Sequence, residues 1–584
     1  MKKLISKNHK VIILSLSLFL FVPSLSGFSQ TLPNEEYEVT PKPWTILLYD
    51  DADFNNAYDP YTSIINNTGS TANVNLLILR DREFDPAHIY YINENYHPII
   101  LEGLGEINMG ESETLRSFIQ YAKSNYPADR YLLTLYNHGG GWQGACWDNT
   151  NNSDHLEMNE IQQALEATGG VDIITFSACR MGCIESVYEL RNEVDVYIGS
   201  EEMHGFGEYW LEIPGVLTEN KDSSTNDIAE KIIQVYKDKY PFFGHFYDWT
   251  ISLLLQKMMG IFPYPPALTI SAISTDGITK LASSIDDLSK TLHDNIRDYE
   301  KILSRVRFIV EDYPRPMRLS SPFGDSIDIL QFVTLLENQI YKNENKELTQ
   351  KIEQIKNLLN NIIIDEYNQI GHRKSTGLSI YFPPLFGFSK NYNDLYDNCS
   401  LDFTHDTNWD EFLRMLFLGD ENNENETNID QSQLEIGSGS VLCDDFIWAQ
   451  SFIPTKDRLT KVSIPLIKNG FIITKVIFSI RNNLSEADIV QCSKSSFEIP
   501  FPFQYQGWLT FNIDDMSLNE GGTYYLVCKT RSGNNRNTHY TWLASETDVY
   551  EHGESWISYD LGKSWHSWKE FGNQGFDFSF KTYY

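Results

Sequence analysis

Two apolar runs of this sequence end in residues that can act together in catalysis. The run over 130–137 is followed by His138 and three successive glycines, and the run over 171–178 is followed by Cys179. A cysteine thiolate is a nucleophile, and a nearby imidazole can help form it or protonate a departing amine. Because the carboxyl ends of parallel strands meet at one edge of a sheet, we expect His138 and Cys179 to be neighbours.

The glycines after His138 fit the same chemistry. A side chain at Gly139 would obstruct backbone donors that must come within about 3 Å of a substrate oxygen. We therefore expect the amides of Gly139 and Cys179 to form an oxyanion hole. Taken singly, the cysteine also fits a buried core position and the histidine a loop position or a metal ligand. Their order and spacing on two neighbouring strands favour a catalytic dyad.

The elements around these residues alternate between strand and helix. The sequence predicts strands over 44–50, 74–81, 130–138, 171–179 and 194–200, and helices over 113–122, 153–167 and 182–190. The first helix should bury Leu115, Phe118, Ile119 and Ala122, and the second should begin at a Ser153 or Asp154 cap. This alternation is typical of βαβ units and a mostly parallel sheet flanked by helices.

The rest of the chain divides into three parts. Residues 261–418 are richer in helix, including one over 345–363, with a strand over 377–383, and they continue the catalytic core of 43–260. An Asn- and Glu-rich stretch over 419–436 is interpreted as a linker. Residues 437–584 contain many short alternating runs broken by turn residues, which predicts an all-β sandwich. Within it, 558–565 resembles the Asp-box hairpin of bacterial neuraminidases, which marks a turn.

Six segments in order carry a further resemblance: "WTILLYDDAD", "EINMGESETLRSFIQYAKSNYPADRYLLTLYNHGGGW", "SACRMGCIESVYEL", "VDVYIGSEE", "TGLSIYFP" and "TNWDEFL". Together they make the stretch from Trp44 to Phe417 similar to the clostripain family of cysteine peptidases. The resemblance implies a caspase-like α/β fold, with Cys179 as nucleophile and His138 as general acid and base. It does not extend to the β-domain.

Two departures from the family bear on specificity. Clostripain-like enzymes usually carry an aspartate two residues before the cysteine, where its charge helps to select a basic side chain, but this chain has Ser177. From Gly139 to Ala178 there is no Lys or Arg at which the chain could be cleaved for activation. Both departures argue against the family's basic preference and self-processing. Glu202 and Glu208 could supply a substitute charge in the substrate pocket, or they could be exposed loop carboxylates.

Two further sets of residues leave alternatives open. Asp148 and Asp154 alternate with polar residues as in a calcium loop, without the glycine and final glutamate of an EF-hand, so calcium is possible and a plain polar loop is the other interpretation. The seven cysteines include Cys146, which could pair with Cys183 or Cys399 or be a second thiol near the site. Of Cys443, Cys492 and Cys528 in the β-domain, two could form a disulfide.

The N-terminal segment predicts where the protein acts, and its net charge excludes one class of partner. Lysines precede an apolar run from Val11 to Val22, with small residues after it, so 1–29 is interpreted as a cleaved signal peptide and the mature protein as secreted. No later stretch approaches the roughly 20 apolar residues of a membrane span. The formal net charge of −34 argues against nucleic acid as a partner.

The sequence therefore predicts a secreted cysteine endopeptidase that acts on protein or peptide substrates and requires no cofactor. The alternative is a secreted binding or adhesion protein in which the α/β domain is an inactive scaffold and the sandwich binds a glycan or a cell surface. The 12 tryptophans and 33 tyrosines could supply stacking faces for such a ligand.

Overall fold

The computed structural model describes most of the chain after residue 40. The described residues are 41–52, 67–202, 204–205, 208–241, 268–313, 325–340, 345–383, 396, 399–418, 428–442, 446–469, 472, 474–496, 498–499, 508–530, 539–571 and 575–584. The predicted signal peptide of 1–29 lies outside them, as do Cys443 and residues 419–427 of the predicted linker. In the described part, no helix has the length and apolar character needed to cross a bilayer.

A nine-stranded sheet forms the centre of the α/β part, in the order β13-β10-β9-β8-β5-β1-β2-β3-β4. Its middle five strands are mutually parallel, and the strands at both edges pair antiparallel. The bounds are β1 (Lys42–Asp51), β2 (Val74–Arg82), β3 (Asp85–Ile92), β4 (Pro98–Gly105), β5 (Ala128–Tyr136), β8 (Val171–Ser177), β9 (Val194–Gly199), β10 (Thr269–Ser274) and β13 (Ile363–Asn368). The predicted α/β class is confirmed.

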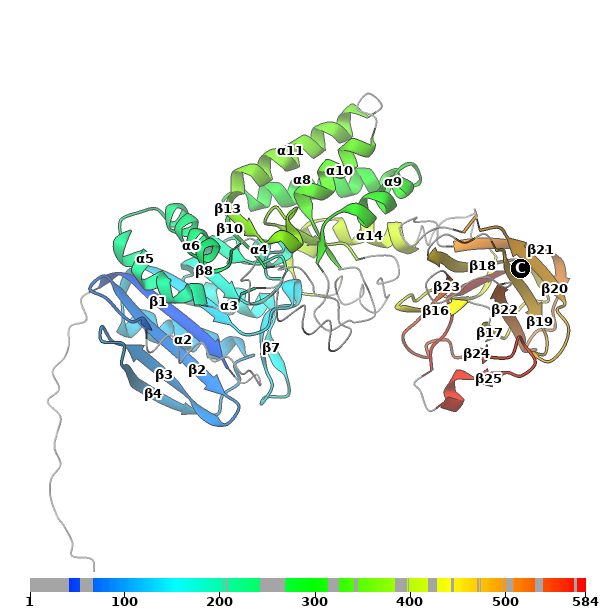
Figure 1. The fold of residues 1–584 in the computed structure, drawn as a ribbon, viewed down its shortest axis with the longest axis horizontal. Coiled ribbons are helices and arrows are strands. Elements are labelled where there is room, and N and C mark those ends of the chain that lie inside the picture. Colours follow the sequence, from blue (N-terminus) through cyan, green and yellow to red (C-terminus); the bar gives the residue numbers. More distant parts are fainter. Residues whose placement is uncertain are drawn as a thin grey trace, which may run out of the picture. The chain divides into compact units, whose positions relative to one another are not determined.

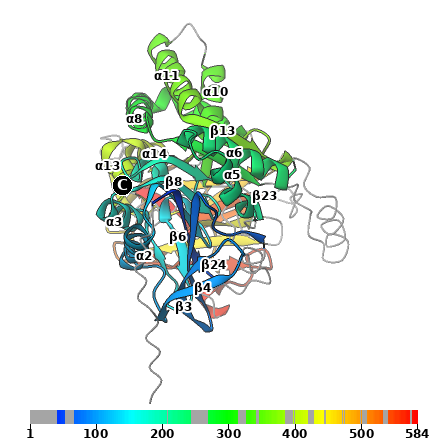
Figure 2. The same cartoon turned by 90° about the vertical axis from the view of Figure 1, so that its left-hand side faces the viewer.

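Helices cover both faces of this sheet (Figures 1 and 2). Alternation along a strand explains why both faces are apolar: in β5, Leu133 and Leu135 join one core cluster while Leu132 joins the other. The first cluster packs against α2 (Ser112–Asn125), α3 (Met158–Thr168), α4 (Ile184–Glu189) and α8 (Ile278–Asp294). The second packs against η2 (Glu208–Glu212), α5 (Ile213–Glu219) and α6 (Thr225–Lys239).

Helices α2 and α3 can be compared with the buried face and the cap predicted for them from the sequence. Helix α2 buries Leu115, Phe118, Ile119 and Ala122, as its periodicity predicted. Helix α3 begins later than predicted, because Glu157 caps it through a capping box with Glu160. The predicted cap at Ser153 or Asp154 is wrong: Asp154–Leu156 forms β7, which pairs antiparallel with β6 (Ala145–Asp148).

The segment over 268–418 is helical, as predicted, but it is also part of the main sheet. Strands β10 and β13 extend the sheet beyond β9. A three-stranded sheet accompanies them, formed by β11 (Asp312–Tyr313), β12 (Ser326–Asp328) and β14 (Ser379–Tyr381). The further helices of the segment are α9 (Ile296–Ile309), α10 (Ile329–Gln339), α11 (Lys346–Ile362), α13 (Asp402–Asp406) and α14 (Trp409–Leu418).

The C-terminal part is all-β, with two six-stranded antiparallel sheets. One contains β15 (Ile429–Gln433), β16 (Ser438–Leu442), β18 (Arg458–Asn469), β21 (Trp508–Ser517), β23 (His539–Ala544) and β26 (Phe580–Tyr583). The other contains β17 (Ile447–Phe452), β19 (Val476–Arg481), β20 (Val490–Lys494), β22 (Tyr524–Thr530), β24 (Ser555–Ser558) and β25 (His566–Ser567). One core cluster joins the sheets, with Phe478 stacked on Phe511 at 4.6 Å between ring centroids. Strand β15 lies within the range expected to be linker, so β structure begins there at Ile429.

Candidate active site

His138 and Cys179 follow neighbouring strands that are in register. Strands β5 and β8 pair in parallel, with Tyr136 opposite Ser177 at their carboxyl ends. Each candidate residue lies two positions further along its own chain, so the register of the strands brings the two backbones to the same point of the sheet edge. This register supports the expectation that the two residues lie at one edge of the sheet.

Gly139 shows how closely the two loops approach. A Cβ atom at this position would lie 2.1 Å from the carbonyl oxygen of Cys179 and 3.1 Å from the Cβ of Ala178. Real Cβ contacts of that length do not occur, so a larger residue would push the loops apart. The first glycine is therefore explained by contact between the histidine loop and the cysteine loop.

Hydrogen bonds fix the shape of the histidine loop. The side chain of buried Asn137 accepts a hydrogen bond from the amide of His138 and donates to the carbonyl of Asp51 at 2.9 Å. The carbonyl of His138 accepts the amide of Cys146 at 3.1 Å. The short η1 helix (Gly141–Gln143) follows, and Gly141 adopts a positive φ of 66° that favours glycine. Sequence reasoning did not single out Asn137, although its place directly before His138 was visible.

The thiol of Cys179 is half-buried and has a backbone donor beside it. The amide of His204 donates to Sγ over 3.4 Å. Burial raises the pKa of the Cys179 thiol, the charge of Glu202 raises it further, and the His204 amide opposes both. The surroundings of His138 exclude water and lower the pKa of its imidazole. Both shifts favour the neutral thiol and the neutral imidazole at pH 7.

Of the two glutamates predicted for the substrate pocket, the structure describes the side chain of Glu202 but not that of Glu208. Glu202 is 5% exposed, so the alternative of an exposed loop carboxylate is wrong for it. Burial raises its pKa to about 7, against the opposing charges of His372 and Arg180. Glu202 therefore lies among charged groups next to Cys179. Glu208 begins η2, but its side chain lies outside the described residues.

Ser177 lies on the same face of the sheet as the helices α5 and α6. It is 6% exposed, and its hydroxyl is near that of Tyr209, which also approaches the Thr175 hydroxyl at 3.3 Å. Ser177 is therefore a buried, uncharged group two residues from the nucleophile candidate.

Arg180 anchors the chain directly after Cys179, a role that sequence reasoning missed. Its backbone has a positive φ of 66°, and its amide donates to the carbonyl of Glu202 at 2.7 Å. Its buried guanidinium forms an ion pair with Asp325, next to β12. Asp325 is 145 residues away along the chain, so no local sequence signal could have identified this contact.

The carboxylates of both calcium candidates, Asp148 and Asp154, already accept hydrogen bonds from protein donors. Asp148 is buried, and its carboxylate accepts the amides of Met109 and Asn151 at 2.8 and 2.9 Å and the hydroxyl of Thr150 at 2.9 Å. Asp154 accepts the side-chain amide of Asn108 at 2.6 Å. A cation at Asp148 would have to displace these donors. Within the described ranges, no group of three or more His, Cys, Asp or Glu side chains could hold a metal ion.

Every described cysteine is a free thiol. Cys146 and Cys183 are fully buried, and burial raises the pKa of both thiols. The pairing of Cys146 with Cys183 or Cys399 is therefore not observed. In the sandwich, Cys492 and Cys528 flank Phe478 from its two neighbouring strands, so they cannot join. Cys443 lies outside the described residues.

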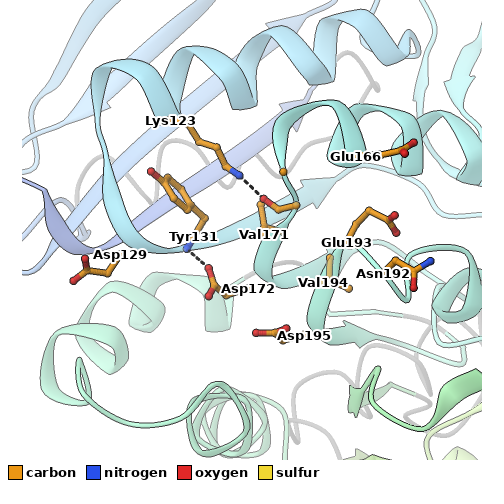
Figure 3. Close-up of a pocket in the computed structure, with 12 residues that line it drawn as sticks. Lys123, Asp129, Tyr131, Glu166, Val171, Asp172, Asn192, Glu193, Val194 and Asp195 are labelled. Atoms are coloured by element: carbon orange, nitrogen blue, oxygen red, sulfur yellow. Dashed lines mark hydrogen bonds between the residues drawn. The ribbon is translucent and has the colours of Figure 1, made fainter.

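A separate hollow of about 580 Å3 opens at the other end of the parallel strands (Figure 3). Its lining comes from the starts of β5, β8 and β9 and includes Lys123, Asp129, Glu166, Asp172, Glu193 and Asp195. Lys123 donates to the carbonyl of Thr168 at 2.9 Å, and Asp172 accepts the amide of Tyr131 at 2.7 Å. These contacts join neighbouring elements, and the described residues that line the hollow include no Cys, Ser, Thr or His.

Comparisons with known proteins give a family match. A model of the clostripain family matches residues 50–416. Clostripain from Hathewaya histolytica is 34% identical over 188 residues, an alignment that covers 25% of this chain and 36% of that protein. The match thus spans well under half of that relative's own length.

Two solved structures are also similar to this chain. One is an inactive zymogen of a C11 protease from Parabacteroides distasonis, with 22% identity, a TM-score of 0.45, and coverage of 63% of this chain and 99% of that one. The other is a secreted C11 cysteine protease from Bacteroides thetaiotaomicron in complex with an irreversible peptide inhibitor. Its identity is 19%, its TM-score is 0.46, and the match covers 63% of this chain and 99% of that one.

Proposed function

The chain belongs to the clostripain family, and from this premise we propose that it is a secreted cysteine endopeptidase in which His138 and Cys179 form the catalytic dyad. The observation that carries the proposal is the register of β5 and β8 together with the contact of Gly139 on the Cys179 carbonyl. Both features bring the histidine loop and the cysteine loop to one point. The signal-like segment over 1–29 supports export.

In the proposed mechanism, Cys179 attacks the carbonyl carbon of a peptide bond. The shifted pKa values favour a neutral pair, so His138 accepts the thiol proton as Sγ attacks and then gives it to the departing amine. The S–C bond forms as the C=O electron pair moves onto oxygen, and the resulting tetrahedral oxyanion collapses as the C–N bond breaks, which leaves a thioester and the free amine. Water then hydrolyses the thioester and restores the thiol. This chemistry needs no cofactor.

Backbone donors have two roles in this scheme. The amide of His204 already donates to Sγ, so it stabilises negative charge on sulfur during attack. The amides of Gly139 and Cys179 are assigned to the oxyanion that develops on the substrate carbonyl. Donors fixed before the reaction stabilise that charge without reorganisation.

The first test compares the mature protein with its Cys179→Ala variant on a mixed peptide library under reducing conditions. Mass spectrometry identifies each cleavage product. We expect cleavage by the unchanged protein alone. Equal products from both proteins, before and after limited proteolysis to release a latent form, would reject the peptidase and favour the inactive scaffold.

An aromatic surface of the sandwich supports a second function, the binding of glycans. Its second sheet carries a small apolar cluster outside the main core, with Tyr525, Trp556 and Trp565 packed against it. The guanidinium of Arg481 lies 5.9 Å from the centroid of the Trp565 ring. Aromatic rings beside hydrogen-bonding groups suit the faces of sugar rings, so we assign glycan binding to this sheet. Retention of the full chain on insoluble polysaccharide should fall in the Trp556→Ala variant, and unchanged retention would reject the assignment.

A further inference from the structure

Four side chains form a compact group on the face of the sheet that carries Cys179. We call Ser177, His204, Tyr209 and Tyr236 the His204 cluster. The ring centroid of His204 lies 5.4 Å from those of Tyr209 and Tyr236, and its amide contacts Sγ. Ser177 ends β8 and contacts Tyr209, while Cys179 lies two residues beyond the strand, where its Sγ accepts the His204 amide. The cluster therefore lies directly beside the candidate nucleophile.

The tautomer of His204 follows from its surroundings. Its Nδ1 lies 2.7 Å from the carbonyl oxygen of Gly205, and a carbonyl oxygen only accepts, so Nδ1 carries the proton and donates. Nε2 is then an acceptor. It is buried and has no hydrogen-bond partner, while the whole residue is 7% exposed. Burial lowers the pKa of His204 to about 4, so this acceptor is retained at neutral pH.

The same cluster also contains a donor. The hydroxyl of Tyr236 accepts the amide of Gly205 at 2.8 Å, which leaves its own proton to donate. The Ser177 hydroxyl can donate or accept. The His204 cluster thus presents both an acceptor and hydroxyl donors within aromatic walls.

Glu202, whose charge reaches Cys179, also interacts with other charged groups. Glu202 interacts with Arg180 and His372, and also with the carboxylates of Asp312 and Asp325. Among the residues that the structure describes, none with a carboxylate interacts with the imidazole of His204 or the hydroxyl of Tyr209. A buried cation next to these two rings would therefore have no counter-charge from the described part of the chain.

We propose that the His204 cluster selects a carboxamide side chain, that of glutamine or asparagine, on the residue whose carbonyl Cys179 attacks. The proposal rests on the peptidase function above and names its substrate class. The amide N–H of that side chain donates to Nε2 of His204, and its oxygen accepts from Tyr236 or Ser177. One planar group satisfies the acceptor and a donor together.

Other side chains of similar size leave a polar group unsatisfied. Methionine leaves Nε2 without a donor, so the buried acceptor stays unsatisfied in the complex. Glutamate places an acceptor against an acceptor. Lysine and arginine can donate, but the contact of a cation with aromatic rings does not offset the desolvation of a charge that has no counter-charge.

The experiment uses the full mature chain and six fluorogenic peptides that differ only in the residue before the cut: Gln, Asn, Met, Glu, Lys and Arg. The kcat/KM for Gln or Asn should exceed that for Met, Glu, Lys and Arg by at least about tenfold. The Cys179→Ala variant serves as the blank for every peptide.

Two variants separate recognition from folding. His204→Phe keeps a ring but removes Nε2, so the Gln to Met ratio should fall towards one, whatever the overall rate. His88→Phe, on the surface of β3, is the matched control and should leave the ratio unchanged. Ser177→Asp adds a carboxylate to the cluster and should raise the rate after Lys and Arg.

The outcomes distinguish the two proposals. Cleavage that depends on Cys179 and prefers Gln or Asn supports both. Cleavage that depends on Cys179 but prefers Lys, Arg or Met, or an unchanged Gln to Met ratio in His204→Phe, overturns the carboxamide selection and leaves the peptidase in place. No cleavage of any peptide that depends on Cys179 overturns the peptidase and this inference with it.

Discussion

Buried polar groups are arranged differently in the α/β part and in the sandwich. In the sandwich, the carboxylate of Asp577 accepts the side-chain amide of Gln450 and the backbone amides of Val549 and Tyr550, each at 2.9 Å. Around Cys179, by contrast, Nε2 of His204, Oε2 of Glu202 and Nε of Arg180 are buried without hydrogen-bond partners.

The contrast is between buried polar groups whose hydrogen bonds stabilise the fold and buried polar groups that remain available to a ligand. A buried polar group with all its partners fixes the chain around it, as Asp577 does between β17 and the turn before β24. A buried group without partners costs free energy, and another molecule that supplies the partner recovers that cost. Variants in the two regions should therefore affect different properties.

The largest effect should come from the dyad. His138→Ala removes the group that we propose transfers the proton and should lower kcat/KM by about 10³-fold, because general acid–base catalysis contributes on that order. His552→Ala, an exposed histidine of the sandwich, should leave the rate unchanged. Peptide kinetics on both variants provide the measurement. Similar rates for the two would mean that His138 contributes no more to cleavage than an exposed histidine of the sandwich.

The next effect concerns the stability of the sandwich. Asp577→Ala leaves three donors without their acceptor and should destabilise this part by about 3 kcal/mol. Hydrogen exchange followed by mass spectrometry should show faster exchange in β17, β23 and β26, with kcat/KM unchanged. Asp457→Ala, at an exposed position, is the control. Equal exchange in both variants would show that the Asp577 contacts do not stabilise the sandwich.

A third variant tests the contact between the histidine loop and the cysteine loop. Gly139→Ala places a methyl group 2.1 Å from the Cys179 carbonyl oxygen and should displace the dyad, with a loss of about 10²-fold in kcat/KM. The methyl group of Gly215→Ala in α5 meets no atom within 4 Å, and this variant should keep full activity. Full activity in Gly139→Ala would mean that the loops adjust freely.

The smallest effect concerns the reactivity of Cys179. With a pKa of about 7, Glu202 is ionised at pH 8, and its charge raises the pKa of the thiol. Glu202→Gln removes this charge and should speed alkylation by iodoacetamide at pH 8 by about two- to fivefold. At pH 5.5 Glu202 is protonated, so the two proteins should react alike. Glu520→Gln in the sandwich is the control, and a pH-independent difference would argue against the electrostatic cause.

Much of the fold was predictable because its elements have strong local patterns. The periodicity of α2 gave its buried face, and the apolar runs of β1, β2, β5, β8 and β9 are strands that are buried on both faces. The start of α3 was not predictable from its capping residues, because pairing of β7 with β6 overrides the Ser153 cap. The exposed edge strand β4 and the late strands β10 and β13 lack a distinctive pattern, and their places depend on pairing with distant segments.

The sequence by itself was enough to predict the candidate site. His138 and Cys179 each follow an apolar strand, and strands of one βαβ unit lie in parallel at neighbouring positions, so local patterns suffice to bring both residues to one edge. Only the tertiary structure decided the surroundings of that edge. The contacts of Arg180 with Asp325, of Gly139 with Cys179 and of Sγ with the His204 amide join residues from 25 to 145 positions apart. Burial and charge at that scale are properties of packing, which no local pattern encodes.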